Sequence, residues 1–485
     1  MSLSTDAPSL AAPERTTVSN PRRTTLSSRL VGTALEAALD ELAGRLDGGI
    51  VRRSDPDWDA ARAAWQLGAD QRPVAVVLAA SEADVARSLR LATRMGVRVA
   101  PQSSGHGAVA LGPLDGAILL RTSALSRVAV DPVARTATVG AGATWGDVSD
   151  AASPYGLAGL AGSSRTVGVV GYCLGGGLGW LGRLHGLGAG SILAARVALP
   201  GGAVVIASPS EHADLWWALR GGGGAGVVTE LTLRLVEVPE LVAGSLWWPR
   251  ERAAEVLKAW ARLIPVLPRE ITTVARVLTF PDIDPLPPHL RGARMVLVQA
   301  AVAGPVALAD RLLAPLRALE PVMDDVAPVS PDALGHLAMD PPDPSEGAAE
   351  GVVLASFGEA AVDAWLEALE APACAGVVAA DLRQLGGALS PESGHDAALT
   401  GLAGAVAAVA VAPATPVADL AAATRAVETA LAALEPWASA HQYANFVEHP
   451  VEEGVLVGAA HDRLDTIRLS YDPDGTMLRR HGAAH

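Results

Sequence analysis

The segment 99–107 reads VAPQSSGHG, a short apolar run that ends in small residues and carries one imidazole, His106. The apolar run predicts the end of a buried strand, and the small residues predict a tight turn after it. A turn without bulky side chains lets the backbone approach an anion and point successive N–H groups at it. A lone histidine in such a turn is more often structural than catalytic, so the segment alone assigns His106 no role.

Two further glycine-rich segments follow along the chain. Segment 163–179 reads SSRTVGVVGYCLGGGLG, and segment 216–224 reads WWALRGGGG. The first of these does not have the spacing of the dinucleotide-binding motif G-x-G-x-x-G, and no acidic residue follows at the right distance. Each glycine run alone fits tight packing, but two such turns can hold a pyrophosphate between them.

The composition describes a large, acidic protein. With 485 residues the chain is too long for one core and predicts two or three domains. The net charge is 37 − 52 = −15 and no run of lysine or arginine stands out, so neither nucleic acid nor a membrane is an expected partner. No group of residues has metal-ligand spacing, and we expect no metal.

The compartment is inferred from the cysteines and the N-terminus. Cys173 and Cys374 are too few for a disulfide framework and fit a reducing, cytoplasmic location. Arg22 and Arg23 precede an apolar run, which leaves a twin-arginine export signal as the alternative. Acidic residues from Glu36 onward interrupt that run and favour an ordinary helix instead.

The pattern of short strands and helices predicts an α+β fold with two domains. Residues 1–28 predict a disordered start, and residues 29–238 predict a first domain in two subdomains. Residues 239–435 predict a second domain, an antiparallel sheet of four or five strands covered on one face by helices. Within it, the proline-rich stretch 327–350 predicts a loop. Residues 436–485 predict a polar, turn-rich segment that returns to the first domain.

The order of the motifs is more specific than any one of them. The chain has a P-x-S-S-G-H turn, then T-V-G with a triple glycine, then W-A-L-R-G-G-G-G and V-V-T. This order resembles the FAD-linked oxidases of the berberine bridge enzyme-like family, of the bacterial secondary-metabolism type. The resemblance extends over roughly residues 55–481 and includes Tyr443-Ala444-Asn445-Phe446. It implies the two-domain FAD-binding fold of vanillyl-alcohol oxidase and p-cresol methylhydroxylase.

The resemblance also implies a cofactor and its site. His106 occupies the position whose ring nitrogen bonds covalently to the 8α carbon of FAD, so the first domain is the FAD-binding domain and the second binds substrate. The two turns would cradle the pyrophosphate, Val228 would meet the adenine through its backbone, and Tyr443 and Asn445 would lie at the isoalloxazine ring. The implied cofactor-binding residues besides His106 are Pro101, Gln102, Ser103, Ser104, Gly105, Gly107, Ser163, Ser164, Thr166, Val167, Gly168, Gly171, Tyr172, Gly176, Val228, Tyr443 and Asn445.

Three positions refine this picture. Members with two covalent links have a cysteine where this chain has Ser164, so we expect a single link, through His106. Tyr172 stands where the family often has a histidine near the flavin. Val167 lies near the position that controls access of oxygen in the family, which favours an oxidase over a dehydrogenase.

The resemblance implies hydride transfer from an alcohol, amine or related C–H site of a small molecule to FAD, which O₂ then reoxidises. It also implies a tailoring step in secondary metabolism. The alternatives are a net non-redox cyclisation or isomerisation on a flavoprotein, an FAD dehydrogenase, or an oligosaccharide oxidase. The protein would be a monomer or a homodimer.

Hydride transfer requires a group that accepts the substrate's proton. Tyr443 is the first candidate from the sequence, and Asn445 is the second catalytic residue that we expect beside it. Four other titratable residues are expected to be solvated surface rather than catalytic: His395, Asp396, Glu448 and His449.

Overall fold

The structure is a computed structural model that describes residues 28–284, 286–394, 396–415 and 418–481. Of the predicted disordered start, residues 1–28, only Ser28 is described, and it begins helix α1 (Ser28–Ala43). Helices occur together with sheets that are mainly antiparallel, which confirms the α+β class. No helix of the described residues combines the length and hydropathy needed to cross a membrane.

The first sheet places the 99–107 turn. Its strand order is β1-β2-β4-β3, in which β2, β4 and β3 are parallel and β1 is antiparallel. Helix α3 (Glu82–Met95) crosses between β2 and β3; Ser81 caps its start and Gly96, with φ +64°, ends it. Apart from α1 and α3, this region comprises β1 (Gly49–Val51), α2 (Trp58–Arg62), β2 (Ala75–Leu78), β3 (Arg98–Gln102) and β4 (Ala117–Arg121).

The second sheet is antiparallel, with the order β5-β6-β10-β8-β9. Helices α4, α5 and α7 pack on it around a core that includes Trp145, Cys173 and Leu215. The elements of this region are β5 (Val128–Asp131), β6 (Thr136–Gly140), α4 (Trp145–Ala152), β7 (Leu157–Ala158), α5 (Val169–Leu174), α6 (Gly182–His185), β8 (Ile192–Ala198), β9 (Val204–Ala207), α7 (Ala213–Leu219), β10 (Val227–Arg234) and β11 (Val236–Glu237).

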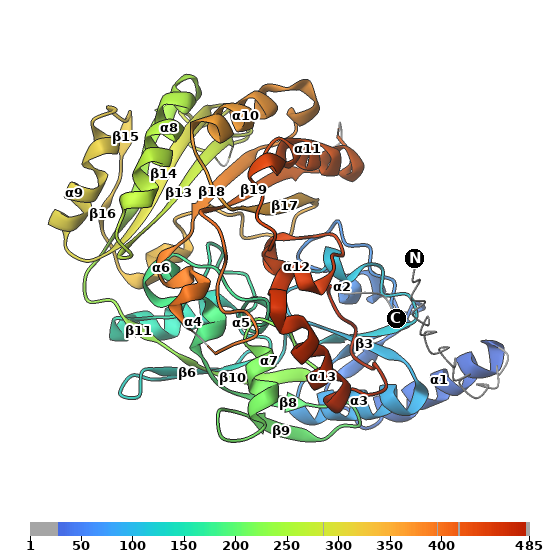
Figure 1. Cartoon of the computed structure of the whole chain (residues 1–485). Coiled ribbons are helices and arrows are strands. Elements are labelled where there is room, and N and C mark those ends of the chain that lie inside the picture. Colours follow the sequence, from blue (N-terminus) through green and yellow to red (C-terminus); the bar gives the residue numbers. More distant parts are fainter. Residues whose placement is uncertain (1–27, 285, 395, 416–417, 482–485) are drawn as a thin grey trace, which may run out of the picture.

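The third sheet is antiparallel and has eight strands, so the expected four or five were too few. Its order is β15-β12-β14-β13-β18-β19-β17, with β16 beside β12. Helices α8, α9, α10 and α11 cover one face and share one core with it, as predicted (Figure 1). The elements are β12 (Leu241–Pro249), α8 (Ala253–Leu263), β13 (Ile271–Thr279), β14 (Arg294–Ala303), α9 (Val306–Arg317), β15 (Met323–Asp324), β16 (Ala327–Pro328), β17 (Gly347–Leu354), α10 (Glu359–Glu370), β18 (Ala379–Gln384), β19 (Val406–Pro413) and α11 (Leu420–Ala432).

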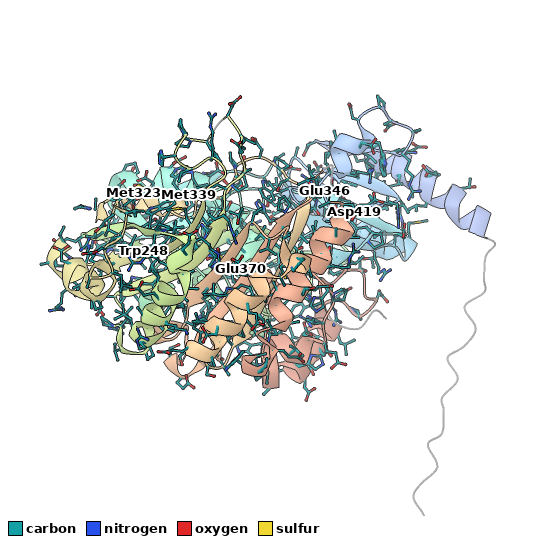
Figure 2. All side chains as sticks on the ribbon, turned by 90° about the horizontal axis from the view of Figure 1, so that it is seen from above. Trp248, Met323, Met339, Glu346, Glu370 and Asp419 are labelled. Atoms are coloured by element: carbon teal, nitrogen blue, oxygen red, sulfur yellow. The ribbon has the colours of Figure 1, made fainter. Side chains whose placement is uncertain are left out.

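Ion pairs support the covering layer at its surface. Glu370, at the end of α10, lies near the middle of this face when the molecule is seen from above (Figure 2). Its carboxylate pairs with Arg250 at 2.8 Å and with Arg294 at 2.7 Å. The uncovered face of the sheet packs against the first half of the chain, where Val353 and Ala407 contact the cluster of Leu178.

The second half holds more regular structure than the sequence indicates. The stretch 327–350 is not entirely a loop, because β16 lies within it and β17 begins at Gly347. The final segment, expected to be turn-rich, also contains α12 (Glu453–Val457) and α13 (His461–Tyr471). It does return to the first half: α13 lies beside α7 (Figure 1), and the Tyr471 hydroxyl donates to Asp214 at 2.8 Å. The domain boundaries at 238 and 435 stay predictions.

Candidate active site

A cavity of about 370 Å³ lies where the 99–107 turn, the 163–179 turn and the C-terminal segment meet. Its volume falls in the range of small-molecule and cofactor sites. Of the residues expected to form the site, all line this cavity except Thr166 and Gly176. Both lie next to residues that line it: the Thr166 Oγ1 is 3.1 Å from the His106 Nε2, and a Cβ on Gly176 would lie 3.1 Å from the Tyr443 ring. The structure therefore brings together the segments that the motif order links.

The first turn needs glycine at its bend. Gly105 has φ +87°, which favours glycine, and a Cβ there would lie 2.8 Å from the Cβ of Ala64. The strand before it is fixed from the other end of the chain, because the N–H of Leu478 donates to the carbonyl of Val99 at 2.8 Å. Sheet pairing on both sides of β3 thus holds the turn at the edge of the cavity.

His106 is held by two hydroxyl groups and an indole ring. Its Nδ1 lies 3.0 Å from the Ser104 Oγ, and its Nε2 lies 3.1 Å from the Thr166 Oγ1. Its ring stacks on Trp65, with 4.1 Å between ring centroids and 14° between planes. Burial lowers the pKa of His106 to about 4. The imidazole is therefore neutral at neutral pH, with one nitrogen lone pair available for bond formation.

Ser104 joins the two turns. Its Oγ accepts the backbone N–H of Gly168 at 3.2 Å while contacting the His106 ring. On the far side, the Oγ atoms of Ser164 and Thr166 lie 3.0 Å apart. A continuous series of hydrogen bonds thus crosses both turns and fixes the imidazole ring in place. It runs through Gly168, Ser104, His106, Thr166 and Ser164.

Tyr443 and Asn445 enter the cavity from the short 3₁₀ turn of the C-terminal segment. The Tyr443 hydroxyl oxygen accepts the N–H groups of Gly177 at 3.0 Å and Leu178 at 2.8 Å, and the Asn445 amide at 3.0 Å. Donors aimed at one oxygen stabilise its anionic form, but burial outweighs them and raises the pKa of Tyr443 to about 12. Tyr443 is therefore a neutral phenol at neutral pH.

Tyr172 borders the cavity on the glycine-rich side. Its hydroxyl donates to the carbonyl of Leu160 at 2.9 Å, and its ring meets Trp145 edge-on at 5.3 Å. Burial raises its pKa well above the usual value. A Cβ on Gly177 would lie 2.5 Å from the Tyr172 ring, so the triple glycine also makes room for this side chain.

The other titratable candidates divide between cavity and surface. Glu448, expected to be solvated, instead lines the cavity, and burial raises its pKa to about 7. It accepts the N–H of Ala349 at 3.2 Å. Asp396 is exposed and His449 is 64 % exposed, as expected. His395 lies outside the described residues.

Sequence reasoning missed three residues that shape the site: Trp65, Arg383 and Arg480. Arg383 and Arg480 line the cavity, and Trp65 supports His106. The sequence shows two tryptophans close together, Trp58 and Trp65, and an arginine pair, Arg479 and Arg480. Nothing in their spacing connects them to residues 100–107 or 443–446. Only the fold brings them together.

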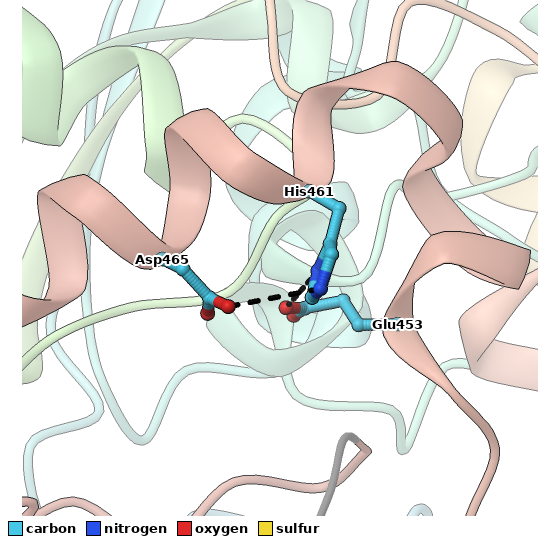
Figure 3. A group of neighbouring side chains, drawn as sticks. All are labelled: Glu453, His461 and Asp465. Atoms are coloured by element: carbon cyan, nitrogen blue, oxygen red, sulfur yellow. Dashed lines mark hydrogen bonds and ion pairs between the residues drawn. The ribbon is translucent and has the colours of Figure 1, made fainter. Parts of the chain in front are cut away.

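Glu453, His461 and Asp465 form a ligand-like cluster elsewhere in the C-terminal segment, with atoms within 4.8 Å of one another (Figure 3). Arg468 bonds Glu453, and Arg479 pairs with Asp465 at 3.1 Å. These guanidinium groups already balance both carboxylates, so we assign no metal there. The cluster ties α12 to α13.

Comparisons with known proteins indicate an FAD-binding domain in the first half of the chain. Residues 73–208 match the family model of an FAD binding domain. The chain is 33% identical to (R)-6-hydroxynicotine oxidase of Paenarthrobacter nicotinovorans over 205 residues, 42% of this chain and 45% of that protein. It is 33% identical to glucooligosaccharide oxidase of Sarocladium strictum over 225 residues, 44% of each chain. These alignments thus span less than half of the length of either relative.

Solved structures agree over nearly the whole chain. BBE-like 1 of Physcomitrella patens has a TM-score of 0.79 at 19% identity and covers 92% of this chain and 99% of its own. The 6-hydroxy-D-nicotine oxidase of Arthrobacter nicotinovorans has a TM-score of 0.77 at 24% identity and covers 90% of this chain and 97% of its own. The fold is therefore the flavoprotein fold of the vanillyl-alcohol oxidase type, as the motifs imply.

Proposed function

We propose that the chain is an oxidase of the berberine bridge enzyme-like family of FAD-linked oxidoreductases, with FAD bound covalently through His106. FAD, once bound, accepts a hydride from an alcohol, amine or related C–H site and passes the electrons to O₂, which yields H₂O₂. The substrate is a small molecule, and we propose a tailoring step in secondary metabolism. A single flavin link and a monomeric or homodimeric state stay predictions.

One observation carries the proposal: a neutral, oriented imidazole stands at the junction of the two glycine-rich turns. Its low pKa leaves a lone pair on the ring, and Ser104 and Thr166 fix its direction. Any buried histidine needs hydrogen-bond partners, so what distinguishes His106 is its place in the cavity lining, between the two glycine-rich turns.

The residues present fit a bound FAD. Gln102 Nε2, Arg383 Nε and Arg480 Nε are buried at the cavity and have no hydrogen-bond partner within the described chain. Buried polar atoms of this kind are costly unless a ligand satisfies them. Gly105 and Gly168 carry no side chain within the two turns, and a Cβ on Gly168 would lie 3.0 Å from the Ser103 Oγ. Glycine turns of this kind can bring backbone N–H groups close to a pyrophosphate.

Two groups of the chain can accept the substrate's proton. We propose that Tyr443 and Asn445 act as a catalytic pair at the ring. Tyr443 can accept the substrate's proton only after it has lost its own proton to solvent, and the three donors on its oxygen favour that phenolate form. Glu448 is the competing acceptor, because a pKa of about 7 suits a general base at neutral pH better than one of about 12.

Acid precipitation of the purified protein tests the flavin link. Wild-type protein should retain yellow flavin in the pellet, and His106→Ala should release it. Flavin in the wild-type supernatant, or in the H106A pellet, would refute His106 as the covalent anchor.

A substrate panel tests the activity. Alcohols, amines and oligosaccharides are offered to the holoenzyme while peroxide and flavin reduction are measured. Peroxide release with one class supports an oxidase of that class. Flavin reduction without peroxide indicates a dehydrogenase, and product formation without flavin reduction indicates a non-redox reaction.

A further inference from the structure

Arg480 reaches the cavity from the last described residues of the chain. Its guanidinium lies against Gly107, where a Cβ would be 2.8 Å from the Cζ of Arg480. Its Nη1 donates to the Oδ1 of Asn445 at 3.1 Å, and the residue lines the cavity. Glycine at position 107 is what allows this contact.

The charge of Arg480 has no matching anion in the described residues. Its Nε is buried and has no hydrogen-bond partner there, and no described carboxylate lies within ion-pair distance. The nearest acidic groups are Glu448 and Glu350, and Glu350 pairs with His449 at 2.8 Å instead. The adjacent Arg479 is the opposite case, because it pairs with Asp465 at 3.1 Å.

A buried cation without an anion costs free energy, so the site is prepared for negative charge that arrives with a ligand. The Cα atoms of consecutive residues are about 3.8 Å apart, which puts the Gly107 contact next to the proposed flavin anchor, His106. A ring bonded to His106 would therefore have this guanidinium as a neighbour of its anchor, in a buried setting where charge interactions are strong.

We propose that Arg480 stabilises the negative charge that the isoalloxazine ring carries once it has accepted electrons. The proposal rests on the proposed function, since it requires flavin on His106. Arg480 is then a positioning and tuning residue: it raises the reduction potential of the flavin and holds Asn445 beside Tyr443. Asn445 in turn donates to the Tyr443 oxygen at 3.0 Å.

Sulfite titration gives a readout that does not depend on turnover. Sulfite donates an electron pair to the oxidised ring, so one bond forms and the ring takes a negative charge without a proton. Three variants of the holoenzyme are compared with wild type: Arg480→Met, Arg480→Lys and Arg479→Met. The sulfite Kd is measured by absorbance, and the midpoint potential is measured by dye equilibration.

We expect R480M to bind sulfite at least tenfold more weakly and its potential to fall correspondingly, by about 30 mV per tenfold for a two-electron couple. R480K should lie within about threefold of wild type, because it keeps the charge, and R479M should match wild type. If R480M matches wild type, or if R480K and R480M are equally impaired, the proposal is wrong.

Loss of flavin in a variant is also decisive. If R480M folds but retains no flavin, the flavin content of R480K decides. Flavin bound to R480K supports the need for a positive charge at position 480, and an R480K protein without flavin shows that the proposal is wrong. If the wild-type protein itself holds no flavin, the proposed function fails. If the wild type holds flavin and R480M leaves its Kd and potential unchanged, only the inference about Arg480 fails.

Discussion

Burial sets the protonation state of the candidate site residues. His106 and Glu448 both line the cavity, and desolvation favours the neutral form of each: it lowers the pKa of the histidine to about 4 and raises that of the glutamate to about 7. The order of the motifs along the sequence pointed to His106, which its own turn could not do. It could not identify Glu448, because nothing near residue 448 in the chain indicates that it is buried.

Covalent attachment of FAD should be insensitive to pH near neutrality. The folded-state pKa of His106 lies below the value of 6.5 for a free histidine, so the imidazole stays neutral until the pH approaches about 4. We expect the rate of covalent incorporation into apoprotein to change less than about twofold between pH 8 and pH 5.5. A histidine with a pKa of 6.5 would lose about tenfold at pH 5.5, and an inflection there would contradict the burial argument. In-gel flavin fluorescence measures the rate.

Glu448→Gln tests the competing proton acceptor. If Glu448 accepts the proton, it must be ionised, so flavin reduction in wild type should accelerate as the pH rises through about 7. Glutamine should remove this inflection and slow reduction by about 10²-fold. The control is Asp396→Asn, whose exposed side chain lies away from the cavity. Stopped-flow absorbance gives the profile, and an inflection that persists in E448Q would assign the proton to another group.

Elements with strong local signals were predicted well from the sequence. Helix α3 begins and ends at residues with strong capping signals, Ser81 and Gly96, and the apolar runs 271–279 and 294–303 coincide with strands β13 and β14. Strand β12 has a weaker signal, because 241–248 are buried throughout and show no alternation of polar and apolar residues. The two C-terminal helices were missed because packing against the rest of the protein, and not a strong apolar stripe, determines them.

The turn after β3 should tolerate no side chain at Gly105. Alanine there would take a positive φ and overlap Ala64, so we expect Gly105→Ala to lower the free energy of unfolding by about 2 kcal/mol. Gly171→Ala is the matched control: it lies within α5, and a Cβ there meets nothing within 4 Å. Urea denaturation measures both, and equal stability of G105A and wild type would contradict the geometry.

The molecule assembles its site from segments that are far apart in the chain. The cavity draws on residues 101–111, 162–178, 226–228 and 443–480 as well as on strand β18. The order of the motifs predicted that the glycine-rich turns and Tyr443 belong to the site, because each motif can be recognised from a short stretch of sequence. It could not predict the approach of Arg480 to Gly107, which depends on how the C-terminal segment folds back over β3.

Truncation after Gly475 tests this assembly. The change removes the pairing of Thr476 and Leu478 with Val99, the core contact of Met477, and Arg480. We expect the ratio of flavin to protein to fall at least tenfold, together with a lower melting temperature. R479M, which removes an ion pair outside the cavity, should keep its flavin. Full flavin content in the truncated protein would show that the C-terminal segment is not needed for the site.

Peptide mapping of the wild-type protein tests the central claim most directly. Trypsin cleaves after Arg98 and Arg121 and so isolates residues 99–121, which contain His106. We predict that this peptide alone carries the flavin mass and fluorescence, with fragmentation placing the modification on His106. Flavin on any other peptide, or an unmodified 99–121 peptide from protein that is fully loaded with FAD, would contradict the account.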